Sequence, residues 1–343
     1  MWIVLHHFWP QTSGVTPHLI TKGYLAVDLF FILSGLVLYL VYEPAIRAGS
    51  FNIGRFALKR FARLYPVHLV TLCCAVAILW LGPRLGFSGR ELPYDLGKMV
   101  MLHLSLLHAW GITETGGLNY PSWSLSAEAF AYLLFPTLGW IVLRSRHALV
   151  WSVVILVSSV VLFEWLWPDS LRNASDALVF TRFENDFGVL RIVPEFILGM
   201  SIAKALPRLS HGSFWLWAGG LQIIAGLLWD FDVLSVLGFA AILAGCALRD
   251  PRTSGSLHKL GQISYCLYMC HALVQIVGFK LIETTLQYED SAVPSSFLIP
   301  MLITSIICAA VLHLWVERPA QRWILSFSAT TPAVPKAAHC VPR

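Results

Sequence analysis

Two kinds of side chain in this sequence could do acid–base chemistry from within apolar segments. The ionisable residues in or near such segments are His6, His7, Asp28, Glu128, Glu164, Glu195, His271 and His313. An imidazole titrates near neutral pH, so it can take a proton from a hydroxyl or carry an acyl group. A carboxylate beside it would fix its tautomer and stabilise the imidazolium. Because charge at membrane depth is costly, each residue is a functional candidate, and a satisfied structural hydrogen bond is the alternative for each.

The apolar segments around these residues identify a membrane protein. Of the 343 residues, 57% are hydrophobic and 13% are charged, a balance too apolar for a soluble core. A membrane-spanning helix needs about 20 apolar residues. The segments that meet this length cover residues 24–43, 64–82, 123–143, 148–167, 187–205, 213–229, 232–248, 260–282 and 295–316. With the apolar half-span "MWIVLHHFW" at the start, they predict an all-α polytopic membrane protein of about ten transmembrane helices.

Other stretches are interpreted within this framework. The apolar run 98–111 is too short to span and holds two histidines, so we expect a re-entrant or interfacial segment there. We expect one transmembrane domain over 1–328 and a short cytoplasmic tail over 329–343. The seven cysteines fall mostly inside apolar runs, without metal-ligand or disulfide spacing. We interpret them as packing residues and predict no metal site.

Lysine and arginine gather in loops that alternate along the chain, and this pattern predicts its orientation. The clusters lie at 44–63, 144–147, 204–208, 249–259 and 317–322. Placing all of them in the cytoplasm puts both termini there and leaves the polar loop 168–186 outside. We therefore expect a multi-pass protein of a bacterial inner membrane. These loops also account for the net charge of +5, so no nucleic-acid partner is expected.

Five motifs follow one another along nearly the whole chain. They are "GYLAVDLFFILSG" (23–35), "FALKRFARLYP" (56–66), "PSWSLSAEAFAYLLFP" (121–136), "LGQISYCLYMCH" (260–271) and "VERP" (316–319). In this order they resemble the motifs of the membrane-bound acyltransferase-3 family, O-acetyltransferase-like integral membrane proteins. Ala26 stands where that family often has glycine.

The first helix departs further from the family pattern. "IVLHHFWP" (3–10) resembles its histidine end and places His7 at the family position. The basic residue that precedes this histidine in the family would lie upstream of Met1. We therefore expect a late start codon or a truncated start.

The resemblance implies transfer of an acyl group, usually acetyl, from a coenzyme A thioester in the cytoplasm to a hydroxyl of a carbohydrate or another exported acceptor. His7 would then be the base or the acyl carrier, and Glu128 or Asp28 would supply the carboxylate. His6, about 100° away around the helix, is the second choice. The implied partners are the lipid bilayer, acetyl-CoA or another acyl-CoA as co-substrate, and a carbohydrate or glycolipid acceptor.

Two arginines are candidates for binding the co-substrate. Arg60 and Arg63 lie one helical turn apart on the predicted cytoplasmic face, where guanidinium groups could hold phosphates bidentately. The alternative is that they only anchor the helix by the positive-inside rule. The adjoining Tyr65-Pro66 favours binding, and Tyr65 joins the predicted coenzyme A site.

Further motif residues are expected to line or support the cavity. Ser124 and Ser126 could orient Glu128 or donate to a developing oxyanion. Tyr268 and His271 share one helix face and either line the cavity or lock helices together. The remaining supporting candidates are Asp28, Ser34 and Trp123. The ionisable residues near predicted helix ends are expected to reach water: Glu164, Glu195 and His313.

Two other classes of protein would also place charges within a membrane. A transporter or flippase predicts symmetric halves and broken helices, and the sequence indicates neither. An assembly or sensor protein without chemistry would not need clustered histidine, glutamate and arginine motifs. The acceptor, the acyl length, the choice between base and acyl carrier for His7, and the oligomeric state are left open by the sequence.

Overall fold

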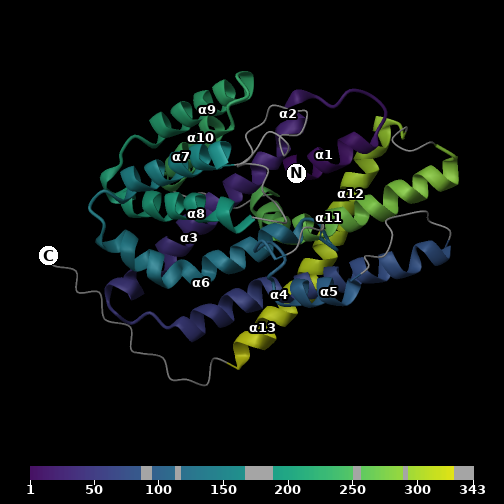
Figure 1. Ribbon diagram of the computed structural model, residues 1–343, viewed down its shortest axis with the longest axis horizontal. Coiled ribbons are helices and arrows are strands. Elements are labelled where there is room, and N and C mark those ends of the chain that lie inside the picture. The colour runs from purple at the N-terminus through teal and green to yellow at the C-terminus, as the bar shows by residue number, and fades with distance from the viewer. Residues whose placement is uncertain (86–94, 113–116, 167–187, 250–255, 289–292, 328–343) are drawn as a thin grey trace.

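The computed structural model describes residues 1–85, 95–112, 117–166, 188–249, 256–288 and 293–327, and the regular structure of this part is helical (Figure 1). The helices are α1 (Trp2–Phe8), α2 (His18–Thr21), α3 (Ala26–Arg47), α4 (Ile53–Leu81), α5 (Leu96–Leu104), α6 (Ser122–Arg144), α7 (Ala148–Leu166), α8 (Gly188–Ala205), α9 (Gly212–Leu228), α10 (Asp232–Ala247), α11 (Ser256–Leu286), α12 (Leu298–Leu312) and α13 (Arg318–Ser326). A π-helical turn, His313–Glu317, joins α12 to α13. The predicted tail over 329–343 lies outside the described residues.

Several of these helices have the length and composition of membrane spans. Within the described ranges six segments qualify: His18–Arg47, Ile53–Leu81, Ser122–Arg144, Ala148–Leu166, Leu260–Leu286 and Ser295–Ser326. Helices α9 and α10 are apolar but shorter. The predicted all-α membrane protein is thereby confirmed, whereas the count of ten spans and the cytoplasmic termini stay predictions. The nine residues of α5 are less than half of the roughly 20 that a span needs, as expected for the short segment near 98–111.

Helices α3 and α8 pack through their backbones. A Cβ atom on Gly35 would lie 2.1 Å from the carbonyl oxygen of Phe196, and one on Gly199 would lie 2.0 Å from that of Ile32. Small residues at helix crossings allow this close approach in membrane proteins. Gly35, the last residue of the first motif, is therefore a packing residue. It holds α8 against the face of α3 that also carries Asp28.

Helices α9 and α10 form a hairpin by the same means. A Cβ atom on Gly219 would lie 2.6 Å from the carbonyl oxygen of Gly238. The turn between the two helices contains Asp230 at φ 55°, a left-handed conformation that aspartate tolerates better than most residues. This turn brings Asp230 and Asp232 to the residues just before α3.

The described residues form two large hydrophobic cores and a small third one, and α1 lies between the two large cores. The first core is built mainly from α3, α6, α8 and α10, and the second from α4, α11 and α12. Val4 and Phe8 are buried in the second core, whereas Trp2 packs against the first. The short helix that carries His7 therefore lies where the two groups of helices meet (Figure 1).

Candidate active site

The imidazole of His7 is half-buried among aromatic rings. Its ring centroid lies 5.2 Å from that of His271 in a stacked arrangement, and 4.8 Å from that of Tyr120 in an edge-on arrangement. His6 contacts it at 5.0 Å, but the Nδ1 of His6 lies 2.9 Å from the carbonyl oxygen of Ile20. Since a ring nitrogen facing a carbonyl must carry a proton, His6 is committed to the backbone. His7 is the better candidate for chemistry.

His271 has a defined tautomer. Its Nδ1 lies 2.6 Å from the carbonyl oxygen of Tyr268, so this nitrogen carries the proton of the neutral ring. The other nitrogen, Nε2, is buried and has no hydrogen-bond partner in the structure. The stacked pair of His7 and His271 therefore includes a buried nitrogen lone pair, which a substrate hydroxyl or a proton could use.

Gln275 and Tyr120 hold His7 from the other side. The Nε2 of Gln275 donates to the carbonyl oxygen of His7 over 2.6 Å, and the Tyr120 hydroxyl donates to Oε1 of Gln275 over 2.5 Å. One amide side chain thus fixes both the backbone of the histidine and the ring that packs against it. We call His7, Tyr120, His271 and Gln275 the histidine site.

Helix α11 places its chemical groups in order along one face. Tyr265, Tyr268, His271 and Gln275 recur every three or four residues, which puts them on one side of the helix. At 1.5 Å per residue, His271 lies about 9 Å further along the helix than Tyr265. The Arg63 guanidinium lies 5.6 Å from the Tyr265 ring. The predicted coenzyme A end and the histidine site are therefore separated by about two turns of α11.

Glu128 is buried close to the arginines and does not contact His7. Its Oε1 accepts hydrogen bonds from the Ser34 hydroxyl at 2.8 Å and from the Tyr132 hydroxyl. The Arg60 guanidinium lies 5.9 Å from the Tyr132 ring. Among the contacts of the described residues, no carboxylate meets the His7 ring. The expected pairing of His7 with Glu128 or Asp28 is therefore wrong, because both carboxylates have other partners.

The residues predicted for coenzyme A have different surroundings. The Arg63 guanidinium forms an ion pair with Glu317 of the "VERP" motif. Arg60 has a buried Nε without a hydrogen-bond partner. The Tyr65 hydroxyl donates to the carbonyl oxygen of Leu104 over 3.0 Å, which ties α4 to the end of α5. Arg60 is thus the member of this group with unused hydrogen-bonding capacity, and a role in coenzyme A binding stays a prediction for all three.

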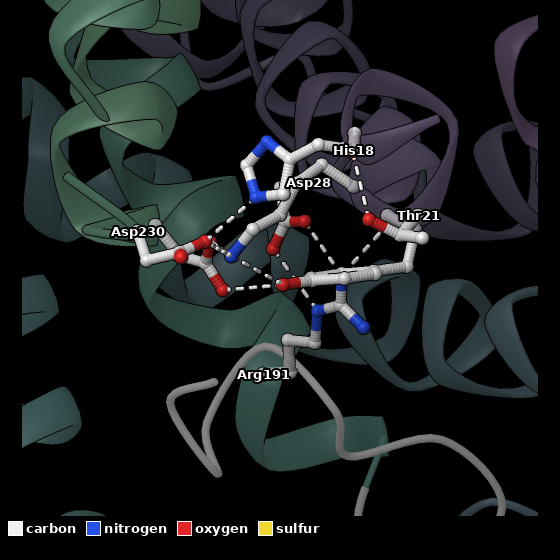
Figure 2. A network of polar contacts seen from close by, with 8 residues as sticks. His18, Thr21, Asp28, Arg191 and Asp230 are labelled. Carbon is white, nitrogen blue, oxygen red and sulfur yellow. Dashed lines mark hydrogen bonds and ion pairs between the residues drawn. The ribbon is translucent and has the colours of Figure 1, made fainter. Parts of the chain in front are cut away.

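Asp28 forms an ion pair with Arg191 inside the protein. Both side chains are 0% exposed, and the guanidinium donates from Nε to Oδ1 over 3.0 Å and from Nη2 to Oδ2 over 2.6 Å. Figure 2 shows the two side chains pointing at each other, from α3 and α8. Glu195, one turn after Arg191, is also fully buried and lies beside Asp28. The expectation that Glu195 reaches water is wrong, because this residue lies in the middle of α8 and its side chain faces Asp28 of α3 inside the protein.

Further charges extend this cluster to the α9–α10 turn. Lys22 is buried, and its Nζ lies 2.9 Å from a carboxylate oxygen of Asp230 and 2.9 Å from one of Asp232. The Tyr24 hydroxyl donates to Asp232 over 2.7 Å, and the Tyr24 carbonyl accepts from Arg191 over 3.3 Å. His18 reaches Asp230 at the exposed end (Figure 2). We call Lys22, Tyr24, Asp28, Arg191, Asp230 and Asp232 the ion-pair network.

The serines of the third motif organise the protein rather than Glu128. The Ser126 hydroxyl donates to the carbonyl oxygen of Leu106 over 2.7 Å, and the Ser124 hydroxyl donates to the Tyr268 hydroxyl over 2.9 Å. The predicted orientation of Glu128 by these serines is therefore wrong. Trp123 is buried against Arg191 and supports the ion-pair network. Ser124, by contrast, joins α6 to the face of α11 that leads to His271.

One cluster in the described part of the chain has the composition and spacing of a metal site, namely Cys266, His313 and Glu317. Here the Arg63 guanidinium already pairs with Glu317, and His313 Nδ1 lies 2.6 Å from the same carboxylate. The carboxylate charge is thus already compensated, and we interpret the cluster as an ion-pair assembly. His313 is buried in it, so the expectation that this histidine reaches water is wrong.

Comparison with known proteins assigns the chain to a family. The model of one protein family, described as an acyltransferase domain, matches residues 1–315 of the chain. The chain belongs to the acyltransferase-3 family. Acyltransferase MdmB of Streptomyces mycarofaciens is 27% identical to this acyltransferase. The match covers 91% of the present chain and 84% of MdmB. The exopolysaccharide production protein ExoZ of Rhizobium meliloti (strain 1021) is 25% identical over 77% of this chain and 80% of the relative. No solved structure matches the chain significantly.

Several residues around the candidate site of this acyltransferase were not identified from its sequence. Arg191 lies in an apolar segment four residues before Glu195, and a charge at that depth was a signal for a buried pair. Gln275 follows His271 by four residues, which places it on the same helix face. Tyr120 directly precedes the third motif and carried no periodic signal, because its position depends on the loop before α6.

Proposed function

We propose that the protein is an integral membrane O-acyltransferase that moves an acetyl group from acetyl-CoA at the cytoplasmic face to a hydroxyl of a carbohydrate acceptor. The observation that carries the proposal is the histidine site itself. His7 lies between the two groups of helices, stacked on a histidine with a buried unpartnered nitrogen. His271, on which His7 stacks, lies about two turns further along α11 than Tyr265, the residue next to Arg63.

His7 acts on the acceptor hydroxyl in this mechanism. Its unprotonated ring nitrogen takes the hydroxyl proton while the oxygen attacks the thioester carbonyl. The new C–O bond forms, the C–S bond breaks, and the proton passes from the imidazolium to the departing thiolate. The products are the acetyl ester and free coenzyme A. If His7 instead carries the acetyl group, its unprotonated ring nitrogen forms a C–N bond as the C–S bond breaks, and the proton of the other ring nitrogen passes to the departing thiolate. In the second step the acceptor hydroxyl attacks the acetyl carbon, the C–O bond forms as the C–N bond breaks, and the hydroxyl proton passes by way of the His271 nitrogen lone pair to His7.

The donor side is supported by the charges near α4. Arg60 has a buried, unpartnered Nε and lies beside Tyr132. A phosphate of coenzyme A would use such a donor, since guanidinium groups bind phosphate through paired N–H donors. The thioester arm would then extend past Tyr132, Ser124 and Tyr268 toward His7. Glu128 supports this path by fixing the Tyr132 hydroxyl.

The acceptor class is supported by the names of two relatives. ExoZ is an exopolysaccharide production protein, and MdmB is an acyltransferase. A carbohydrate hydroxyl is the acceptor chemistry that fits both the first name and the histidine site. The bacterial inner membrane is the proposed location, with the arginine side of α4 facing the cytoplasm.

The test uses membranes from cells that express the full chain. These membranes are incubated with radiolabelled acetyl-CoA, and surface glycans are analysed by mass spectrometry for base-labile acetyl esters. Ester formation that depends on the wild-type chain and disappears with His7→Ala supports the proposal. A folded wild-type protein that neither binds nor consumes acetyl-CoA refutes it.

A further inference from the structure

A cavity of about 510 Å³ lies next to the histidine site. Its walls come from the second half of α4, from the segment before α6 and from α11 between Leu273 and Glu283. Most of the wall is apolar, including Ile78, Leu79 and Phe279. This volume falls within the range of ordinary small-molecule sites, which are mostly apolar with a few placed polar groups.

The polar groups of the cavity connect it directly to His7. Tyr120 and Gln275 both line it, and these are the residues that pack on the His7 ring and hold the His7 backbone. An amide nitrogen has a second N–H to donate and a phenol oxygen can also accept, so both groups can meet a ligand hydroxyl. A hydroxyl bound here would be one ring away from the imidazole.

His7 lies between the cavity and the two arginines of α4, Arg60 and Arg63. Along α11, Tyr265 marks the level of Arg63, His271 contacts His7, and the cavity begins at Leu273. The same order holds on α4, where Arg60 and Arg63 precede the cavity-lining residues by three turns or more of helix. A thioester entering from the arginine side and a ligand in the cavity would therefore meet His7 from opposite directions.

We propose that this cavity is the acceptor-binding site and that it takes a glycoside with an apolar aglycone or lipid portion. The sugar hydroxyls would lie against Tyr120 and Gln275, and the apolar portion along Ile78, Leu79 and Phe279. Lys280 and Glu283, an ion pair at 3.3 Å, also line the cavity and bound it further along α11. This inference rests on the proposed function, because it assigns the second substrate of the same reaction.

The test maps binding with a defined probe, a hexyl β-glucoside that carries a photoreactive diazirine on its hexyl chain. The full-length protein in detergent is irradiated with the probe, and labelled peptides are identified by mass spectrometry. Labelling is expected in residues 273–283 or 75–82. Unlabelled hexyl β-glucoside should compete with it, whereas glucose or hexanol alone at the same concentration should not.

A matched pair of variants tests the site without relying on catalysis. Ile78→Trp fills the cavity and should reduce labelling by at least about tenfold, since one misfitting group in a pocket has effects of that order. Leu81→Trp makes a similar change on the same helix at an exposed position outside the cavity, and should leave labelling unchanged. Thermal unfolding of both variants confirms that they are folded.

Two results would overturn the assignment. The first is labelling of other parts of the protein instead of residues 273–283 or 75–82. The second is labelling of these residues that a folded Ile78→Trp variant retains in full. Acetyl-CoA hydrolysis is measured on the same wild-type sample to separate this outcome from a failure of the proposed function. Hydrolysis without cavity labelling removes only the acceptor site, whereas cavity labelling by a protein that does not use acetyl-CoA refutes the transferase.

Discussion

The ion-pair network and the histidine site both place polar groups deep in the protein, but they differ in how completely those groups are paired. In the network, Asp28 and Arg191 share two hydrogen bonds, and Lys22 lies between Asp230 and Asp232. In the histidine site, His271 has a buried nitrogen without a partner, and a cavity adjoins Tyr120 and Gln275.

We interpret this difference as one between polar residues that stabilise the structure and polar residues that are available for chemistry. A charge buried in an apolar region is a default functional candidate, and Asp28 was one on that ground. Its bidentate ion pair with Arg191 gives the buried charge a structural explanation instead. Loss of either member of such a pair leaves the charge of the other member uncompensated inside the protein. An imidazole with an unused nitrogen beside a cavity retains its chemistry. We therefore expect incomplete pairing next to open space to be the better guide to function in this protein.

The largest expected effect comes from the centre of the histidine site. His7→Ala should reduce acetyl transfer by about 10²–10⁴-fold or abolish it, the range that a general base contributes. Transfer to glycans is measured at equal amounts of inserted protein. His6→Gln is the control, because an amide N–H can still donate to Ile20, and it should keep most of the activity. Full activity of His7→Ala would remove this residue from the mechanism.

The ion-pair network should respond in stability rather than in chemistry. Asp28→Asn removes the carboxylate that pairs with Nε and Nη2 of the buried Arg191 and leaves Glu195 as the carboxylate nearby, and breaking a buried ion pair costs about 3–5 kcal/mol of folding free energy. Thermal unfolding in detergent measures this loss, and the activity of the remaining folded protein should be close to that of wild type. The double variant Asp28→Leu with Arg191→Leu should recover part of the stability. A stable Asp28→Asn protein without activity would place Asp28 with the histidine site.

Gln275 tests whether the histidine site depends on positioning. Gln275→Leu removes the donor to the His7 carbonyl and the acceptor of the Tyr120 hydroxyl, and an unpaired buried group costs about 1–3 kcal/mol. We expect kcat to fall by about tenfold, with the KM for acetyl-CoA unchanged. Leu281→Ala, on the exposed face of the same helix, is the control. An equal fall in both variants would indicate general loss of helix packing.

The two arginines of α4 should differ in the same way, with Arg60 affecting substrate binding and Arg63 affecting stability. Arg60→Ala should raise the KM for acetyl-CoA by about tenfold with a smaller change in kcat, because a phosphate contact is largely uniform binding. Arg63→Ala should instead lower the unfolding temperature, since it removes the guanidinium that pairs with the buried Glu317 and leaves His313 beside that carboxylate. Steady-state kinetics and thermal unfolding of both variants distinguish these roles. Identical behaviour of the two would argue against the separation.

The smallest effect is expected at the exposed end of the ion-pair network. Hydrogen bonds from Lys22 and His18 lower the pKa of the Asp230 carboxyl, whose side chain is 61% exposed. A lowered pKa means that this contribution to stability is complete above the ordinary pKa of aspartate and is lost as the pH falls through the lowered value. Asp230→Asn should therefore flatten the acid limb of a stability–pH curve slightly. A stronger acid dependence in the variant would contradict this assignment.

Much of the fold followed from composition and period. Apolar segments such as 123–143 and 148–167 correspond closely to α6 and α7, because a helix that spans a membrane must satisfy its backbone locally and be apolar over about 20 residues. The close approach of α3 and α8 was not predicted, although Gly35 lay within a quoted motif. A glycine permits such an approach, but which helix makes it depends on the packing of the whole chain.

The sequence by itself determined that this protein is helical, belongs in a membrane and carries the motifs of an acyltransferase, because these properties depend on residue type and local spacing. The tertiary structure decided which polar residues are paired. Asp28 and Arg191 are 163 positions apart, and Arg63 and Glu317 are further apart still. No local period records such pairs. Only the packing of α1 between the two large cores brought His7 beside His271 and beside Gln275, which lines a cavity.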